Sequence, residues 1–349
     1  MPAQVIDLFC GIGGLTRGLI DAGLDVVAGF DIDPTCQYAY EHNNNVPYHI
    51  QNIREVHAND LINIYAPDAT RILVGCAPCQ PFSQMRFKLG EANLQDEKYT
   101  LLLEFGRLIN ELRPSVISME NVPQICETAV YRQYIQILQN IGYHISEHVV
   151  YCPDYGVPQS RRRFVLLGSL LGPIELIAPT HRRNEVNVRD YIGQLPPIEA
   201  GGVDPNDPLH RSASLSETNL RRIRASRPGG SWRDWPDELR CPCHKKDSGQ
   251  TYASVYGRMS WDRIGPTITT QFFNFGTGRF GHPDQDRALS LREGAMLQTF
   301  PQDYDFVDPE RDLVFRDIAR HIGNAVPVRL GEVIGETVLL HLHDNNIGG

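Results

Sequence analysis

A cysteine flanked by two prolines is the residue of this sequence best placed for covalent chemistry. Pro78 and Pro81 stand on either side of Cys79, and Cys76 lies three residues before it. Each proline fixes its own φ and disfavours the helical region for the residue before it, which predicts a stiff loop around the thiol. The apolar run at 71–74 predicts a buried strand just before this loop. Because open α/β sheets bind ligands at the carboxyl ends of their strands, the pattern favours a nucleophilic thiol.

Three other interpretations of Cys79 remain open at this point. Free cysteine is among the most often buried residue types, so the side chain fits a packing role. Cys76 and Cys79 also have the spacing of a redox pair, or of half a metal site. Residues elsewhere in the sequence have to decide among these interpretations.

A second chemical pattern is the glycine turn formed by Gly11, Gly13 and Gly14, between a predicted strand at 5–9 and a predicted helix at 15–22. Glycines let the backbone turn sharply and approach a ligand at a helix N-terminus. Asp31 follows about twenty residues later, where a carboxylate accepts hydrogen bonds from ribose hydroxyls. The spacing departs from the six-residue dinucleotide fingerprint, which disfavours a nicotinamide enzyme.

Two further groups of polar residues lie at predicted strand ends. Glu120 follows the apolar run at 116–119 and is expected to face the same crevice as Cys79. An acid beside a nucleophile suits covalent catalysis with proton transfer. Arg161 and Arg163 precede another strand, where alternation predicts that they point to the same side.

The elements that position these residues alternate between apolar runs and amphipathic stretches through the first half of the chain. We predict strands at 5–9, 26–30, 72–74, 116–119, 148–150 and 164–167, and helices at 15–22, 35–43, 100–112 and 131–141. Such alternation predicts an α/β fold, with a mainly parallel sheet covered by helices on both faces. Residues 172–285 are rich in Pro, Gly, Ser and Arg and predict a separate loop-rich domain, followed by helices at 290–297 and 330–341.

Composition limits the class of protein. A chain of 349 residues, 41% hydrophobic and 21% charged, fits a soluble protein of about two domains. No window contains 18 consecutive apolar residues, and the first four residues lead directly into a strand, so we expect neither a membrane span nor a signal peptide. The eight scattered cysteines form no disulfide framework, which predicts a reducing cytoplasm.

The charge distribution points weakly to nucleic acid. The formal net charge is -9, but residues 181–290 carry 16 Lys and Arg against 13 Asp and Glu. Nearly all of the basic residues are arginine, whose planar fork suits bidentate contacts to phosphate and guanine. The arginine-rich segment therefore fits a nucleic-acid module within an acidic protein.

Six sequence elements in a fixed order give the chain a clear resemblance to the cytosine-C5 DNA methyltransferases, which use S-adenosylmethionine. They comprise DLFCGIGGL at 7–15, PCQPFS at 78–83, ENV at 120–122, QxRxR at 159–163, Arg292-Glu293 with QTFP at 298–301, and GNAVP at 323–327. The resemblance covers most of the chain outside 172–255. It implies a Rossmann-like class I methyltransferase fold with a mixed sheet and helices on both faces. It also implies a catalytic and cofactor-binding domain at 1–180 and 320–349, with a smaller loop-rich target-recognition domain and hinge at 181–319.

The resemblance implies a role for each catalytic residue. The Cys79 thiolate adds to C6 of cytosine and makes C5 nucleophilic, while Glu120 contacts N3 and the exocyclic amine. Arg163, together with Arg161, holds the base at O2. Because C6 is inaccessible within a duplex, the cytosine must be flipped out. The sequence does not identify the base that removes the C5 proton.

The resemblance also implies two sets of binding residues. Those expected to line the S-adenosylmethionine site are Phe9, Gly11, Ile12, Gly13, Gly14, Leu15, Asp31, Ile32, Asn52, Ile53, Pro78, Leu101, Asn324 and Val326. Those expected to contact DNA are Ser83, Arg258, Thr269, Gln271 and Arg279. Asn52 departs from the aspartate common in the family, although its carbonyl oxygen still offers an acceptor for the adenine amine.

The expected partners are double-stranded DNA and a cognate restriction endonuclease or defence-system component in a bacterial cytoplasm, near the nucleoid. The resemblance implies a monomer. A tRNA cytosine-C5 methyltransferase and a catalytically inactive DNA-binding relative are the alternatives. Cys241, Cys243 and His244 look like part of a zinc site, but the second ligand pair is missing; a local turn is favoured and no metal is expected.

Overall fold

The computed structural model describes residues 2–78, 100–181, 186–251 and 254–347. These residues form two compact units. The first unit comprises Met1–Tyr151, Arg162–Pro179 and Val326–Gly349, and the second comprises Cys152–Arg161 and Thr180–Ala325. The second unit thus takes in 152–161 and 320–325, two stretches that the sequence-based domain bounds place with the catalytic part.

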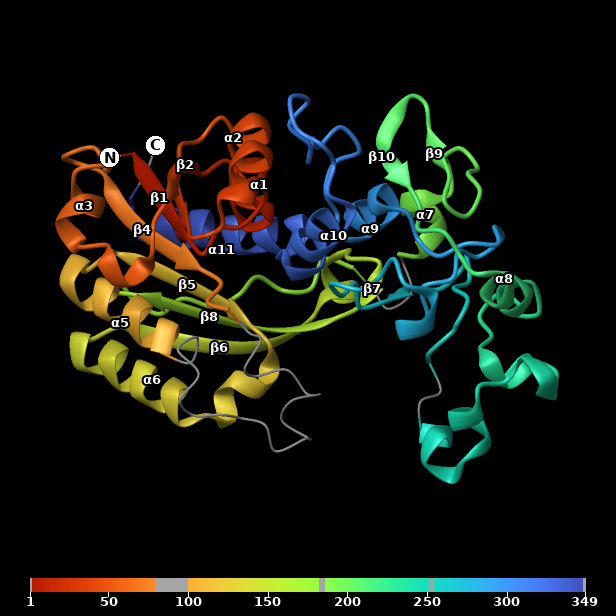
Figure 1. The fold of residues 1–349 in the computed structure, drawn as a ribbon. Coiled ribbons are helices and arrows are strands. Elements are labelled where there is room, and N and C mark those ends of the chain that lie inside the picture. Colours follow the sequence, from red (N-terminus) through yellow and green to blue (C-terminus); the bar gives the residue numbers. More distant parts are fainter. Residues whose placement is uncertain (1, 79–99, 182–185, 252–253, 348–349) are drawn as a thin grey trace. The chain divides into compact units, whose positions relative to one another are not determined.

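A seven-stranded sheet forms the centre of the first unit, in the order β3-β2-β1-β4-β5-β8-β6 (Figure 1). Its strands are β1 (Ala3–Leu8), β2 (Asp25–Asp31), β3 (Tyr48–Ile50), β4 (Thr70–Gly75), β5 (Val116–Asn121), β6 (His144–Tyr151) and β8 (Arg162–Ser169). The pairs from β3 to β5 are parallel, whereas β8 is antiparallel to both β5 and β6. The sheet is therefore mixed, and β1 to β5 end on the same edge.

Helices cover both faces of this sheet (Figure 1). The helices of the first unit are α1 (Gly14–Asp21), α2 (Gln37–Asn44), α3 (Ala58–Ile62), α5 (Leu101–Leu112), α6 (Ala129–Ile141) and α11 (Val328–Asp344). Alternate strand residues such as Ile6, Leu73 and Ile117 join Phe105 of α5 and Leu138 of α6 in one continuous core. On the other face, α1 packs closely against α11, where a Cβ on Gly18 would come within 2.2 Å of backbone.

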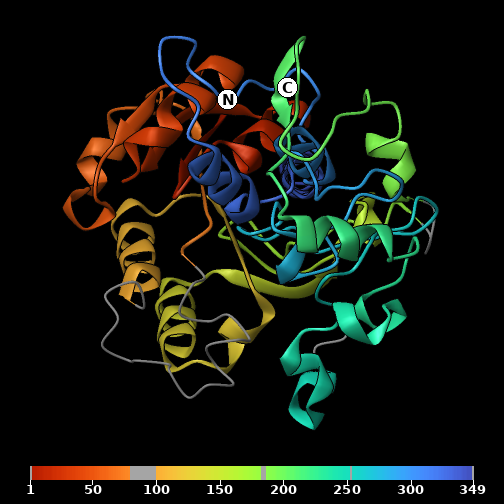
Figure 2. The same ribbon diagram turned by 45° about the vertical axis from the view of Figure 1, so that its right-hand side comes forward.

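Short elements joined by long connections make up the second unit, where the chain between α8 and β11 (teal in Figures 1 and 2) runs through brief 3₁₀ turns. Its helices are α7 (Val188–Ile192), α8 (Glu217–Arg224), α9 (Leu291–Leu297) and α10 (Phe315–Asn324). Its strands are β7 (Gln159–Ser160), β9 (Val203–Asp204), β10 (Asp207–Arg211) and β11 (Gly265–Pro266). The two-residue pairing of β7 with β11 shows how little regular sheet holds this unit.

Buried polar side chains connect the short elements of the second unit. The Gln159 amide donates to Gln298 Oε1 at 2.7 Å and accepts from the Ile268 N–H at 2.9 Å. Gln298 in turn donates to the carbonyls of Ile322 and Ala325. This chain of hydrogen bonds ties β7 to the end of α9 and the end of α10, so the QxRxR and QTFP elements serve one scaffold.

None of the helices within the described ranges is long and apolar enough to cross a bilayer.

Candidate active site

The glycine turn after β1 is held by the carboxylate at the end of β2. Phe9, Gly11 and Gly13 all have positive φ, at 60°, 51° and 84°, so the chain reverses tightly before α1. Asp31 accepts from the Gly11 N–H at 2.9 Å and from the Asp33 N–H at 3.0 Å. Burial raises the pKa of Asp31 above its ordinary value, although these backbone donors oppose the rise. The carboxylate keeps lone pairs for a further donor.

A buried hydrogen-bond network lies beneath this turn and was not anticipated from the sequence. Thr16 donates to Asp7 Oδ2 at 2.7 Å and lies 3.0 Å from the Tyr40 hydroxyl. Burial raises the pKa of Asp7 to about 7, against the opposing effect of the Thr16 hydrogen bond. The sequence did contain a signal for this network, because Asp7 is a charged residue type within an otherwise apolar strand.

Side chains from separate elements surround the glycine turn. Among the described residues, nothing lies within 4 Å of a Cβ added to Gly11, so the turn borders open space in this part of the structure. Ile32 is 65% exposed, unusual for a large apolar side chain in this fold, and is available to pack on a ligand. Asn52 and Ile53 begin a 3₁₀ turn that Arg107 holds, because its Nη2 donates to the Ile53 carbonyl at 3.2 Å.

The remaining predicted cofactor residues fall into three groups. Ile12, Leu15 and Ile53 are buried, so their side chains belong to the core. Leu101 and Pro78 are partly buried in the first unit, where Val326 is buried. Asn324 is exposed at the end of α10 and belongs to the second unit. The side-chain oxygen of Asn52, Oδ1, is expected to accept from the adenine amine. It already accepts from the Arg54 N–H at 3.2 Å.

Glu120 is buried at the end of β5 and has a partner on each carboxylate oxygen. The Cys76 thiol donates to Oε2 at 2.8 Å, and Arg163 Nε forms an ion pair with Oε1 at 2.8 Å. Cys76 follows β4 and Arg163 lies on β8, the two strands on either side of β5. The sheet order therefore brings together two residues, Glu120 and Arg163, that are 43 positions apart in the sequence. Sequence reasoning predicted both of them but gave Cys76 no role at this carboxylate.

The described chain just before Cys79 is held by a buried side chain. Asn121 is buried, and its amide donates to the Ala77 carbonyl at 2.9 Å. Asn121 thus anchors the chain two residues before Cys79. Cys79 itself and Ser83 lie outside the described residues, so their predicted roles stay predictions.

Arg161 has a different environment from Arg163. It is 2% exposed in the second unit, where Nη1 donates to the Ile268 carbonyl at 3.1 Å and Nη2 to the Ala325 carbonyl at 3.3 Å. The strand that contains Arg163 begins at residue 162, so the strand alternation assumed for both arginines does not extend to Arg161. Its guanidinium holds backbone of the second unit together.

The four described candidates for DNA contact also differ among themselves. Thr269, Gln271 and Arg279 are exposed. Arg258 is only 7% exposed and forms an ion pair with Asp286 at 2.7 Å. Arg258 therefore has a structural partner, whereas Arg279 presents its side chain to solvent.

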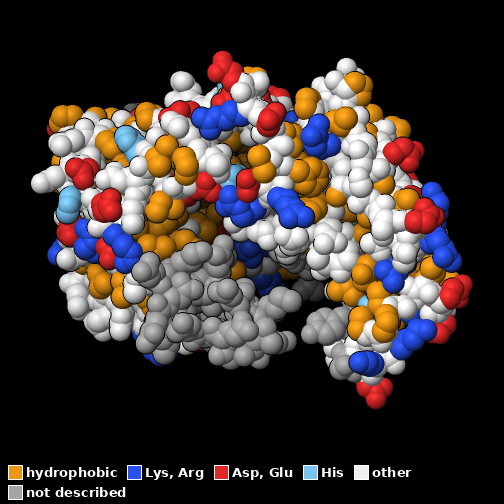
Figure 3. Space-filling view, viewed as in Figure 1, with side chains coloured by type: hydrophobic (Ala, Val, Ile, Leu, Met, Phe, Trp, Pro, Cys, Tyr) orange, Lys and Arg blue, Asp and Glu red, His pale blue; other side chains and the backbone are white. Residues whose placement is uncertain are grey.

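The arginine-rich segment does not produce a single basic patch on the face drawn in Figure 3, where basic and acidic side chains are interspersed. Many of its arginines pair with nearby carboxylates. Examples are Arg189 with Asp262 and Arg227 with Asp234. Some of the basic side chains between 181 and 290 are thus engaged in local ion pairs.

Comparisons with known proteins identify the family of the chain. The family model for C-5 cytosine-specific DNA methylase matches residues 3–339. The chain is 52% identical over 342 residues to the type II methylase M.HgiDII of Herpetosiphon aurantiacus, covering 97% of this chain and 95% of the relative. It is 30% identical over 354 residues to the type II methyltransferase M.PspPI of a Psychrobacter strain, covering 97% and 80%.

A solved structure shares the fold. It is a candidate DNA modification methyltransferase encoded within a prophage of E. coli, with a TM-score of 0.72 and 22% identity over 98% of this chain and 99% of that one. The match extends over both units, including the mixed sheet. The chain belongs to the family of C-5 cytosine-specific DNA methylases and is a DNA (cytosine-5-)-methyltransferase.

Proposed function

We propose that the protein transfers the methyl group of S-adenosylmethionine to C5 of a flipped-out cytosine in a specific duplex DNA sequence, through a covalent bond between Cys79 and C6. The observation that carries this proposal is Glu120, buried at a strand end between the Cys76 thiol and Arg163. A buried carboxylate at this position suits recognition of the polar edge of a pyrimidine. Asn121 supports the proposal because it fixes the start of the loop that carries Cys79.

The proposed chemistry divides between the nucleophile and its neighbours. Cys79 attacks C6, and the electrons of the C5=C6 bond become available at C5 to take the methyl group. Glu120 binds N3 and the exocyclic amine and stabilises the charge that develops in the ring. Arg163 holds Glu120 in place through their ion pair and donates to O2 of the base. After the methyl transfer, loss of the C5 proton restores the double bond and expels the Cys79 thiolate.

The residues around the glycine turn fit S-adenosylmethionine, which supplies an electrophilic methyl group on a sulfonium. The open space beside Gly11 admits a ligand close to backbone. In this proposal Asp31, which accepts from the Gly11 N–H, also accepts from ribose hydroxyls, and the exposed Ile32 packs on the adenine ring. Asn52 retains a lone pair for the adenine amine beyond the hydrogen bond it accepts from Arg54.

Target recognition is assigned to the second unit, with Arg279, Gln271 and Thr269 as the residues that contact DNA. Arg161 and Arg258 are assigned positioning roles, because each already holds backbone or a carboxylate. Similarity to a type II methylase suggests that this protein protects the target of a cognate restriction endonuclease in the same cell. The family resemblance implies that it works as a monomer.

Trapping with a modified base tests the covalent step. DNA in which 5-fluorocytosine replaces cytosine should form a stable adduct with the wild-type protein and S-adenosylmethionine, because fluorine cannot leave C5 as a proton does. Cys79→Ser and Cys79→Ala should form none, whereas Cys76→Ala should still form it. Equal trapping by Cys79→Ala would overturn the mechanism. Genomic DNA and total tRNA offered in parallel should show methyl transfer to DNA alone.

A further inference from the structure

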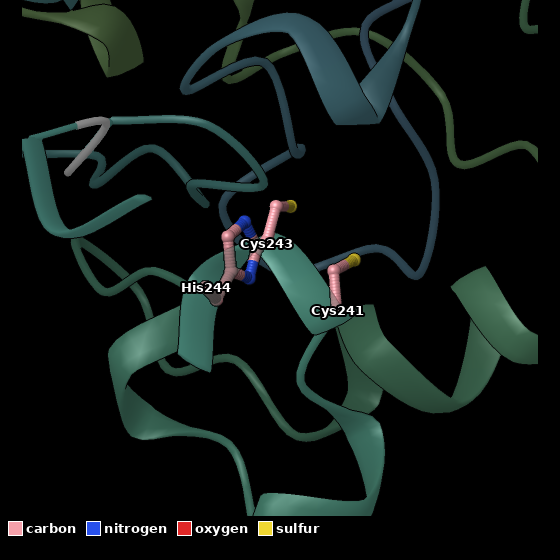
Figure 4. A group of neighbouring side chains, drawn as sticks. All are labelled: Cys241, Cys243 and His244. Atoms are coloured by element: carbon pink, nitrogen blue, oxygen red, sulfur yellow. The ribbon is translucent and has the colours of Figure 1, made fainter. Parts of the chain in front are cut away.

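We propose that Cys241, Cys243 and His244 bind a zinc ion that supports the loop-rich part of the second unit. The three residues come from one turn, η9 (Pro242–Lys245), and its preceding residue (Figure 4). Their ligand atoms, two sulfurs and an imidazole nitrogen, all lie within 4.8 Å of one another. Thiolate and imidazole are the ligands that structural zinc sites use.

The distances are close to those that a tetrahedral metal requires. Bonds of about 2.3 Å to sulfur and about 2.0 Å to nitrogen place the ligand atoms roughly 3.5 to 4 Å apart. The three atoms thus need to approach one another by about 1.3 Å at most, which rotation of the cysteine side chains supplies. The backbone is already fixed, because the His244 N–H donates to the Cys241 carbonyl at 2.9 Å and the Lys246 N–H to the Cys243 carbonyl at 3.2 Å.

Aromatic residues hold the imidazole in place. His244 is 4% exposed and stacks on Trp232, with ring centroids 4.2 Å apart and planes 20° apart. Tyr256 meets the same imidazole edge-on at 5.8 Å. The Tyr256 hydroxyl also hydrogen-bonds to the Cys241 side chain, the type of outer contact that orients a metal ligand. A ring clamped in this way presents its nitrogen in one direction.

The surrounding fold gives zinc a structural purpose. Between α8 and β11 the described chain has only the short 3₁₀ turns η7 (Trp232–Asp234), η8 (Asp237–Leu239), η9 and η10 (Asp247–Thr251). Its core is a small cluster around Trp232 and Trp235. A zinc ion bound to the residues of η9 would rigidify the chain between α8 and β11, because His244 also stacks on Trp232. Three protein ligands leave the fourth position for a water molecule.

Metal binding to the intact protein tests the proposal. Protein purified with reductant and chelator, then exchanged into Zn²⁺, should hold one equivalent of metal per chain by elemental analysis. Co²⁺ in its place should give a thiolate charge-transfer band in the near ultraviolet and the visible bands of a tetrahedral ion. Zinc should also raise the thermal midpoint, because it binds only the folded site.

Variants decide whether these residues hold the metal. Cys243 is exposed, so Cys243→Ser should leave the fold intact by circular dichroism and weaken Co²⁺ binding on the order of 100-fold. His244→Asn keeps both thiolates and should weaken Co²⁺ binding and shift the visible bands of the tetrahedral ion. The matched control is Cys126→Ser, a partly buried thiol in the first unit, which should bind metal like wild type. No thiolate band in the reduced wild type, or an unchanged band in Cys243→Ser, would overturn the proposal.

Discussion

Polar groups are buried in both units, but they serve different ends. In the first unit, Glu120 at the end of β5 accepts from Cys76, and Asp31 at the end of β2 accepts from the glycine turn. In the second unit, Arg287 and Glu293 are fully buried and make a bidentate ion pair at 2.6 and 2.7 Å. Regular backbone hydrogen bonding already stabilises the sheet, so its polar ends are available for chemistry. The second unit has little regular structure and uses polar side chains to hold itself together.

The largest loss of stability is expected when a buried ion pair of the second unit is broken. Glu293→Gln leaves the Arg287 guanidinium buried without its countercharge and should destabilise the protein by about 3–5 kcal/mol. The measurement is urea unfolding followed by tryptophan fluorescence, since Trp232, Trp235 and Trp261 all lie in the second unit. Arg189→Gln breaks the exposed pair with Asp262 and should cost about 1 kcal/mol or less. Equal losses of stability in Glu293→Gln and Arg189→Gln would contradict the view that the buried ion pair holds the second unit together.

The same pair predicts an acid limit for the second unit. Although burial alone raises it, the charge of Arg287 lowers the pKa of Glu293 from 4.5 to about 2. An acid with a depressed folded pKa stabilises the protein above its unfolded pKa. That stability should therefore be lost as the pH falls from about 4.5 toward 2, and Glu293→Gln should remove this part of the pH dependence.

A large effect of another kind is expected at the sheet edge, on catalysis rather than on stability. Glu120→Gln keeps the shape of the side chain but removes its charge, and should lower kcat by about 10²–10³-fold. Affinity for S-adenosylmethionine, measured by calorimetry, should stay close to wild type. Glu127→Gln, an exposed neighbour on the same connection, is the matched control and should be silent. A lower thermal midpoint of Glu120→Gln with an unchanged kcat would instead show that Glu120 stabilises the fold and does not act in catalysis.

Asp7 is a buried polar residue of the first unit for which no ligand contact is predicted. It therefore tests whether a polar group in this unit can affect stability alone. Its folded pKa is raised to about 7 from 3.8, so the unfolded chain ionises first as the pH rises. Stability should then fall between pH 4 and 7 by as much as about 1.4 kcal/mol per pH unit. Asp7→Asn should flatten this slope, and Asp25→Asn, at an exposed position, should leave it unchanged. A wild-type stability that is level over this range would contradict the expectation.

The smallest effects are expected at two arginines of the second unit. Arg279→Ala should weaken DNA binding modestly and reduce the slope of log affinity against log salt by about 1, with no change in stability. Arg258→Ala removes a buried partner of Asp286 and a donor to the Gln285 carbonyl, so it should lower the thermal midpoint. Fluorescence anisotropy over a salt series measures the first effect and calorimetry the second. If Arg279→Ala lowered the thermal midpoint and Arg258→Ala reduced the salt dependence of DNA binding, Arg258 would be the DNA contact and Arg279 the structural residue.

Sequence reasoning succeeded where local pattern and fold agree. The strands predicted at 26–30, 72–74 and 116–119 all lie within observed strands, and the helix predicted at 100–112 is α5. It missed β3, which has three residues, and α10, because the first is too short for periodicity and the second follows an irregular segment. The antiparallel direction of β8 also had no local signal, since apolar runs look alike in either direction.

The order of motifs along the chain determined the family and the kind of reaction, and it predicted Glu120 and Arg163 as site residues. Their types and positions at strand ends are local properties, which a sequence carries directly. Only the tertiary structure decided that Arg163 pairs with Glu120 while Arg161 holds backbone in the second unit, and that Arg258 is buried while Arg279 is exposed. Which partner an arginine meets depends on contacts between residues far apart in sequence, and no local pattern records those contacts.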